Sequence, residues 1–153
     1  MVEPEVPEAD LSTTDRPLSF DYAALDGTRV TGESTRGRIT VVVFITTYDL
    51  RSQIILRELS ELMHTKTPRF NTLGVVLEPP KNAPLVDAFA TTMELPFRLA
   101  LSPSPEAFDE GEFGKVDAVP TVVILDRRGM QRFRRAGHMS TAELDAAISQ
   151  ANR

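Results

Sequence analysis

The sequence predicts a single mixed α/β domain, a sandwich in which a central mixed β-sheet is flanked by helices and preceded by a small N-terminal β-hairpin. Two observations predict it. Apolar, β-branched runs at residues 39–45, 73–77 and 121–125 alternate with stretches of helical periodicity. The chain of 153 residues also has an apolar content of 41%, which is typical of one globular domain.

The opening residues 1–16 differ in composition from the rest of the chain. They contain Pro4 and Pro7, little that is apolar, and five acids: Glu3, Glu5, Glu8, Asp10 and Asp15. Such a segment cannot bury enough apolar surface to fold alone. We therefore expect residues 1–16 to form an extended, solvated tether and residues 17–153 to form the domain.

The first strands are expected to form a hairpin. Residues 18–22 and 29–31 flank Asp26 and Gly27, a dipeptide suited to a tight turn because glycine accepts a positive φ. The three apolar runs follow, and their near-continuous hydrophobicity favours strands covered on both faces. A turn at residues 126–129 predicts that the last run pairs antiparallel with residues 130–136.

Helical periodicity identifies three helices. The first spans about residues 50–66 and the second lies around residues 86–93, with apolar side chains at intervals of three and four. The third begins at Ser140, where Ser140 and Glu143 match the capping-box pattern that satisfies exposed backbone N–H groups.

Two motifs carry a family resemblance. Residues 41–52 resemble the strand and active-site turn of thioredoxin-like proteins, most closely the TlpA-like and ResA-like group related to the AhpC/TSA redoxins, where an aromatic residue precedes Cys-x-x-Cys. Val119-Pro120-Thr121, 70 residues after Asp49, resembles the family's Val-Pro-Thr, whose peptide bond is cis and faces that turn. The resemblance covers most of residues 17–153 and implies a thioredoxin-like three-layer sandwich.

The sequence departs from this family at its chemistry, because the chain contains no cysteine. Asp49 and Ser52 occupy the two sulfur positions, and Tyr48 stands where the family usually has tryptophan. Thr46 and Asp49 also match the Thr-x-x-Cys of peroxiredoxins. Disulfide exchange requires a thiolate, so the resemblance implies a redox-inactive domain that lacks peroxidase activity as well.

Asp49 has two interpretations. Aspartate before a helix is a preferred N-cap, worth about 1 kcal/mol. Alternatively, Asp49 and Ser52 form a small anion or cation site in the former redox pocket. Tyr48 is interpreted as a packing residue with its hydroxyl in water.

An enzymatic role for Ser52 would require a nearby histidine. The only histidines are His64, expected at the far end of the helix that Asp49 begins, and His138, expected in the connection before the last helix. A metal site from Asp49, His138 and Met139 is a further alternative, although the soft thiolate ligands of copper-delivering Sco-like relatives are missing. We predict no metal and no cofactor.

The last hairpin is basic. Charges on an exposed sheet edge oppose aggregation, and the rival interpretation is a docking strip for an acidic partner or for the acidic tether itself. The arginines concerned are Arg127, Arg128, Arg132, Arg134 and Arg135.

The functional prediction is binding of a protein or extended peptide at the former active site. In the family, backbone at the residue before the conserved proline hydrogen-bonds an extended segment, a strand-addition mode that needs no cysteine. The alternatives are a cysteine-independent enzyme, a metal or small-ligand site at Asp49 and Ser52, and a purely structural module. The predicted binding residues are Tyr48, Asp49, Ser52, Val119 and Pro120.

Composition limits the other partners. The net charge of −5 argues against nucleic acid, whose binding relies on a basic surface. No apolar run approaches the roughly 20 residues of a membrane-spanning helix, and residues 1–4 lack the basic start of a signal peptide. The resemblance implies a bacterial cell envelope or periplasmic location, with the acidic tether as a possible link to an anchor.

Overall fold

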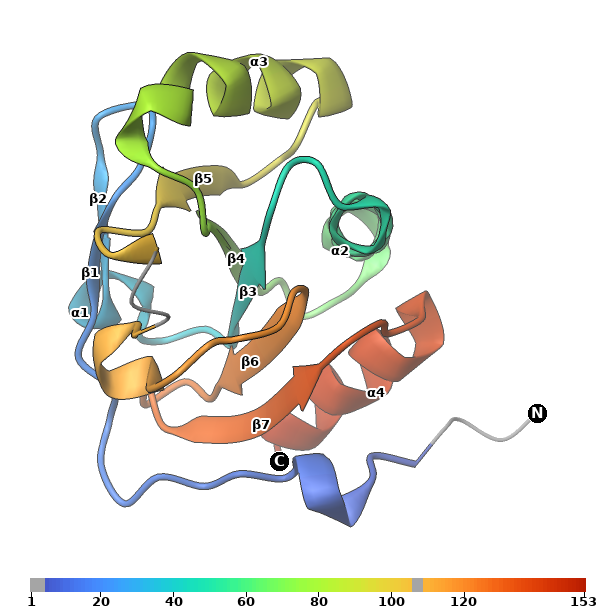
Figure 1. Cartoon of the computed structure of the whole chain (residues 1–153). Coiled ribbons are helices and arrows are strands. Elements are labelled where there is room, and N and C mark those ends of the chain that lie inside the picture. Colours follow the sequence, from blue (N-terminus) through green and yellow to red (C-terminus); the bar gives the residue numbers. More distant parts are fainter. Residues whose placement is uncertain (1–4, 106–108) are drawn as a thin grey trace.

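The protein is built around a five-stranded mixed sheet, seen in a computed structural model that describes residues 5–105 and 109–153 (Figure 1). The strand order is β5-β4-β3-β6-β7. β3, β4 and β5 run parallel to one another, whereas β6 is antiparallel to both β3 and β7. The predicted mixed sheet is confirmed. The strands are β3 (Thr40–Ile45), β4 (Asn71–Val76), β5 (Arg98–Leu101), β6 (Thr121–Leu125) and β7 (Gln131–Ala136).

The three predicted helices are present. Asp49 is the N-cap of the first of them, and Ser140 and Glu143 form both bonds of the predicted capping box at the last. In the part of the chain that the structure describes, no helix is long and apolar enough to cross a membrane. The helices are α1 (Gly32–Thr35), α2 (Leu50–Thr65), α3 (Ala83–Met93) and α4 (Thr141–Ala151), and the short 3-10 turns are η1 (Glu8–Asp10), η2 (Pro80–Asn82) and η4 (Gly111–Phe113).

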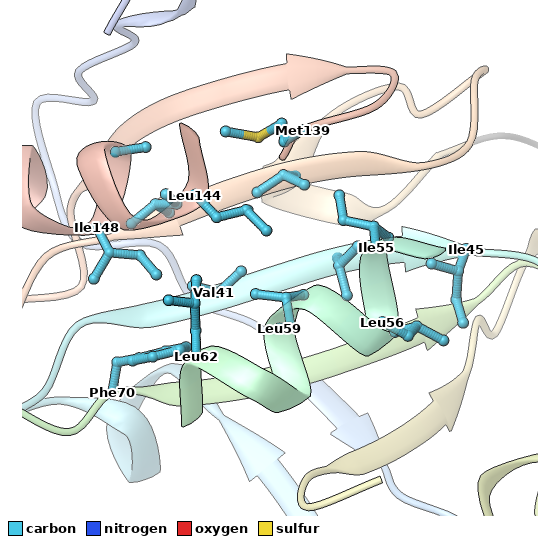
Figure 2. Close-up of a cluster of buried hydrophobic side chains, with 14 of the residues drawn as sticks. Val41, Ile45, Ile55, Leu56, Leu59, Leu62, Phe70, Met139, Leu144 and Ile148 are labelled. Carbon is cyan, nitrogen blue, oxygen red and sulfur yellow. The ribbon is translucent and has the colours of Figure 1, made fainter. Parts of the chain in front are cut away.

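The core has two apolar clusters, one on each face of the sheet. Alternate residues of a strand point to opposite faces, and all six residues of β3 are buried. Val41 and Ile45 belong to the cluster beneath α2, α3 and α4. On this face of the sheet, side chains of α2 and α4 pack together above β3 (Figure 2). Val42 and Phe44 join the second cluster. β3 is therefore covered on both faces, as its continuous hydrophobicity predicts.

The predicted N-terminal hairpin supplies the third layer. β1 (Asp21–Ala23) pairs with β2 (Arg29–Thr31), and the turn between them contains Gly27 at φ +88°. Tyr22 of β1 and Phe113 of η4 belong to the second apolar cluster. The layers are thus helices, sheet, and hairpin with η4.

β5 was not among the predicted strands. It is a four-residue edge strand that begins with the exposed Arg98 and pairs only through β4 within the main sheet. Its apolar stretch is too short to stand out beside the longer runs of β3, β4 and β6, because a brief edge strand needs burial on only part of its surface.

The acidic leader differs from the expected solvated tether. Leu11 bridges Phe133 of β7, Ser12 N–H donates to the carbonyl of Arg132 at 3.2 Å, and the Asp10 carboxylate lies 2.9 Å from Arg135 Nε. The edge of β7 offers unpaired backbone groups together with a cation, so the leader pairs there. The edge of β7 is therefore covered along this stretch, while residues 1–4 lie outside the described residues.

Candidate functional site

The fold brings the two sequence motifs together at one end of the sheet. Residues 46–49 follow the carboxyl end of β3, which lies between β4 and β6. The antiparallel register pairs Phe44 with Thr121. Val119 and Pro120 directly precede Thr121, and Thr46 directly follows β3, so the two motifs lie at the same end of neighbouring strands.

Asp49 and Ser52 are hydrogen-bonded to each other. Asp49 Oδ2 accepts hydrogen bonds from Ser52 N–H at 3.3 Å and from Ser52 Oγ at 3.2 Å. Ser52 Oγ in turn accepts the N–H of Thr46 at 3.3 Å. Ser52 is fully buried. The pair therefore fastens the end of β3 to the first turn of α2, and only Asp49 is partly accessible from outside.

Glu78 is a residue of this region that the sequence interpretation did not identify. It is buried, and its carboxylate accepts hydrogen bonds from Thr47 N–H at 2.7 Å, Thr47 Oγ1 at 2.8 Å and Asn82 Nδ2 at 2.8 Å. A charged acceptor makes such bonds stronger than neutral ones. Glu78 thus fixes the turn to the loop after β4. The sequence feature that could have identified Glu78 is its position, an acidic residue directly after the apolar run of residues 73–77.

Exposed apolar side chains gather around the turn. Among the described residues five large hydrophobic side chains are exposed, and four of them lie on the turn, α2 or the start of α3: Tyr48 at 77%, Leu85 at 68%, Leu50 at 67% and Ile54 at 38%. The predicted packing role of Tyr48 is not supported, because most of its surface faces solvent. The fifth is Leu11, in the leader.

A groove adjoins these side chains. It lies between α2 and α3, has a volume of about 490 Å³ and reaches Thr47. Gln53 and Arg57 line it from α2, and Leu85 and Phe89 line it from α3. The turn therefore borders a groove on the side of β4 that is lined by both polar and apolar side chains.

On the side of β6, the Val119–Pro120 peptide bond is cis. Pro120 is buried, and its carbonyl accepts the N–H of Gly137 at 2.7 Å. Val119 is half-buried. Within residues 5–105 and 109–153, neither its N–H nor its C=O takes part in a hydrogen bond. These two backbone groups are free to bond to another chain.

Comparison with known proteins identifies the fold. No model of a known protein family and no curated protein matches the sequence. A putative thiol:disulfide interchange protein DsbE from Chlorobium tepidum superposes with a TM-score of 0.74 at 18% identity, covering 92% of this chain and 98% of its own. StoA from Bacillus subtilis gives 0.69 at 18% identity, with 88% and 98% covered.

A secreted Mycobacterium tuberculosis disulfide oxidoreductase homologous to Escherichia coli DsbE gives a TM-score of 0.68 at 18% identity, covering 86% of this chain and 95% of its own. The fold is thioredoxin-like. Two of these neighbours are described as a thiol:disulfide interchange protein and a disulfide oxidoreductase, whereas this thioredoxin-like chain has no cysteine.

Among the described residues, neither histidine is hydrogen-bonded to Ser52, whose hydroxyl bonds to Asp49 and Thr46 instead. His64 is in the last turn of α2, and His138 is exposed before α4. Met139, which the metal alternative would use, is fully buried in the core (Figure 2) and is not exposed for ligation. In the described ranges, 5–105 and 109–153, no three His, Asp or Glu side chains form a cluster suited to a metal ion.

Glu58 and Tyr22 are among the groups away from the turn whose pKa values are shifted. Burial raises the pKa of the Glu58 carboxyl, and nearby His138 partly offsets this. Glu58 Oε2 is buried without a hydrogen-bond partner in the described part of the chain. Burial, with the neighbouring Glu110, also raises the pKa of Tyr22. The Tyr22 hydroxyl donates to Glu110 at 2.7 Å, and Ser102 Oγ donates to the other Glu110 oxygen at 2.6 Å.

Proposed function

We propose that this thioredoxin-like domain binds an extended segment of a protein partner at the position where its structural neighbours carry out thiol-disulfide chemistry. The observation that carries the proposal is the gathering of exposed apolar side chains around a turn that has no sulfur. Large exposed apolar patches on a soluble domain mark interaction surfaces. Tyr48, Leu50 and Leu85 are each more than half exposed here.

The free backbone of Val119 suggests how the partner is held. An extended peptide that adds beside an exposed backbone gains affinity from main-chain hydrogen bonds and specificity from its alternate side chains. Val119 supplies an N–H and a C=O that no described residue occupies. Tyr48 follows β3, the neighbour of β6 in the sheet, and it offers a large amphipathic ring with few rotatable bonds.

The binding is reversible in this proposal. A mixed disulfide joins a sulfur atom of each partner, formed when a thiolate attacks a disulfide, and this chain has no cysteine to supply its sulfur. Tyr48, Asp49 and Val119 are the residues expected to touch the partner. Ser52 and Pro120 are buried and support the residues that contact the partner. Ser52 holds Asp49 through a hydrogen bond, and Pro120 anchors the segment that carries Val119 through its bond to Gly137.

No observation favours the enzymatic alternative over binding. Ser52 Oγ is buried and already bonded to Asp49 and to Thr46 N–H. A nucleophilic serine needs an adjacent base and access to its substrate, and the carboxylate that contacts it also caps α2.

The test combines peptide selection with NMR. Extended peptides are selected from a random displayed library on the wild-type protein, and the tightest is titrated into isotopically labelled protein. Amide shifts at Tyr48, Asp49, Leu85 and Val119 are expected, with little change in β7. Saturable binding that shifts only residues outside these four would reject the site. An unrelated domain is the control in the selection. If no peptide binds this protein better than it binds the control, the proposal is also rejected.

We also propose a cell-envelope location, with the acidic leader as the link to an anchor. The support is the Mycobacterium tuberculosis neighbour, which is described as secreted. Fractionation of the native source with an antibody to this domain tests the location. Recovery in the envelope fraction is expected, and recovery with cytosolic markers alone would contradict it.

A further inference from the structure

We propose that the domain has a second, independent site that binds a small molecule carrying phosphate or clustered carboxylate groups. The site, here called the arginine pocket, is a cavity of about 380 Å³. Four arginines from separate segments line it: Arg29, Arg38, Arg69 and Arg98.

The arginine pocket lies at the opposite end of the sheet from the former active site. Thr40 begins β3, Asn71 begins β4 and Arg98 begins β5, and all three line the cavity. The three strands are parallel, so their amino ends lie together at one end of the sheet. Asp49 follows the carboxyl end of β3 and therefore lies at the other end. A six-residue strand separates the two regions by about 20 Å. A ligand here need not compete with a peptide at Tyr48.

The charges in the pocket are only partly balanced by the protein. Arg29 pairs with Asp21 at 2.7 Å and Arg98 pairs with Asp26 at 3.0 Å. Arg38 and Arg69 form no salt bridge with any residue of ranges 5–105 and 109–153. The described lining contains no aspartate or glutamate. The chain as a whole has a charge of −5, so this concentration of positive charge is local.

Neutral groups complete the site. Thr72 lines the pocket, is nine-tenths buried, and its hydroxyl has no hydrogen-bond partner among the described residues. This oxygen is itself enclosed, so it is not an open contact of the cavity. Met63 and Phe97 give the cavity apolar lining. The site therefore combines charged donors with an apolar wall.

This lining selects the class of ligand. Guanidinium groups present fixed pairs of N–H donors that match carboxylate and phosphate oxygens, two bonds at a time. The volume lies in the range of ordinary small-molecule sites, roughly 300–1,000 Å³. Arg38 and Arg69 are the primary anion contacts in this proposal, because their donors are not already committed to a carboxylate.

Isothermal titration calorimetry with two probes, sodium pyrophosphate and sodium citrate, tests the proposal and separates the phosphate from the carboxylate source. Saturable binding of at least one probe is expected. The double variant Arg38→Ala/Arg69→Ala is expected to weaken it by about tenfold or more, since each loses a charge-assisted contact. Arg127→Ala/Arg128→Ala is the matched control, because it removes the same charge from the turn between β6 and β7 and should leave the affinity unchanged.

The wild-type protein provides a readout that does not depend on the folding of a variant. Pyrophosphate or citrate should shift the amide resonances of Asn71 and Thr72 and leave those of Tyr48 and Asp49 in place. No saturable binding of either probe at millimolar concentration overturns the proposal. So does binding that survives in Arg38→Ala/Arg69→Ala, or that is lost equally in the control.

Discussion

Replacing Ser52 with alanine tests whether the Asp49–Ser52 pair has a structural role. Ser52 Oγ is buried, accepts Thr46 N–H at 3.3 Å and donates to Asp49 at 3.2 Å. Alanine removes both bonds and keeps the volume nearly constant. It leaves the Thr46 N–H without a partner in the interior and gives the Asp49 carboxylate one donor fewer.

The magnitude follows from these two contacts. An unsatisfied buried donor lowers the free energy of unfolding by about 1–3 kcal/mol. The higher helix propensity of alanine offsets roughly 0.5 kcal/mol of this loss. We therefore expect Ser52→Ala to lower the free energy of unfolding by about 1.5 kcal/mol. For a chain of this length that lowers Tm by roughly 3–6 °C.

Urea denaturation followed by circular dichroism measures this difference. Ser60→Ala is the matched control, because Ser60 also lies on α2 but its hydroxyl only donates to the carbonyl of Leu56 at 2.8 Å. Ser60→Ala should be neutral or slightly stabilising. If Ser52→Ala also stays within about 0.5 kcal/mol of wild type, the range of ordinary surface changes, the structural role of the Asp49–Ser52 pair is refuted.

Three further predictions concern buried groups and the lost chemistry. Tyr22→Phe removes the donor to buried Glu110 and should lower stability by about 2 kcal/mol in chemical denaturation; an unchanged midpoint would contradict that network. The pKa of Glu58 is raised on folding, so its ionisation destabilises the fold as pH rises above the ordinary carboxyl range. Glu58→Gln should therefore stabilise at neutral pH, by less than about 1 kcal/mol because the group is partly solvated, and have no such effect in acid; equal gains at both pH values would count against it. Asp49→Cys/Ser52→Cys sets a thiol at the N-terminus of α2, where thiolate is favoured, and should catalyse disulfide reduction that wild type does not; equal rates would show that the activity has another source.

The fold could be predicted wherever burial is complete or a cap is local. β3 and β6 are buried on both faces and have continuous apolar runs, and α4 begins at a capping box of neighbouring residues. β5 escaped prediction because it is a short edge strand with an exposed first residue. The docking of residues 10–14 on β7 also depends on tertiary proximity, since Asp10 and Arg135 are far apart in the chain.

The geometry around the proposed site could be predicted only in part. Motif positions select Tyr48, Asp49, Ser52, Val119 and Pro120, and the pairing of β3 with β6 explains why the two motifs lie at the same end of the sheet. The burial of Ser52 and the contact of Glu78 with Thr47 depend on how β3, β4 and α2 pack. The arginine pocket collects residues between 28 and 98 from five segments, so no local pattern signals it.

The measurement that tests the binding proposal most directly compares the affinity of a selected extended peptide for three proteins: wild type, Tyr48→Ala and Leu11→Ala. Tyr48 and Leu11 are both exposed, but only Tyr48 belongs to the turn. Truncating a central aromatic contact costs about 2 kcal/mol or more, so Tyr48→Ala should weaken binding roughly thirtyfold while Leu11→Ala binds as wild type does. Equal affinity for all three proteins, or a loss confined to Leu11→Ala, would contradict the proposal that the surface around Tyr48 is the binding site.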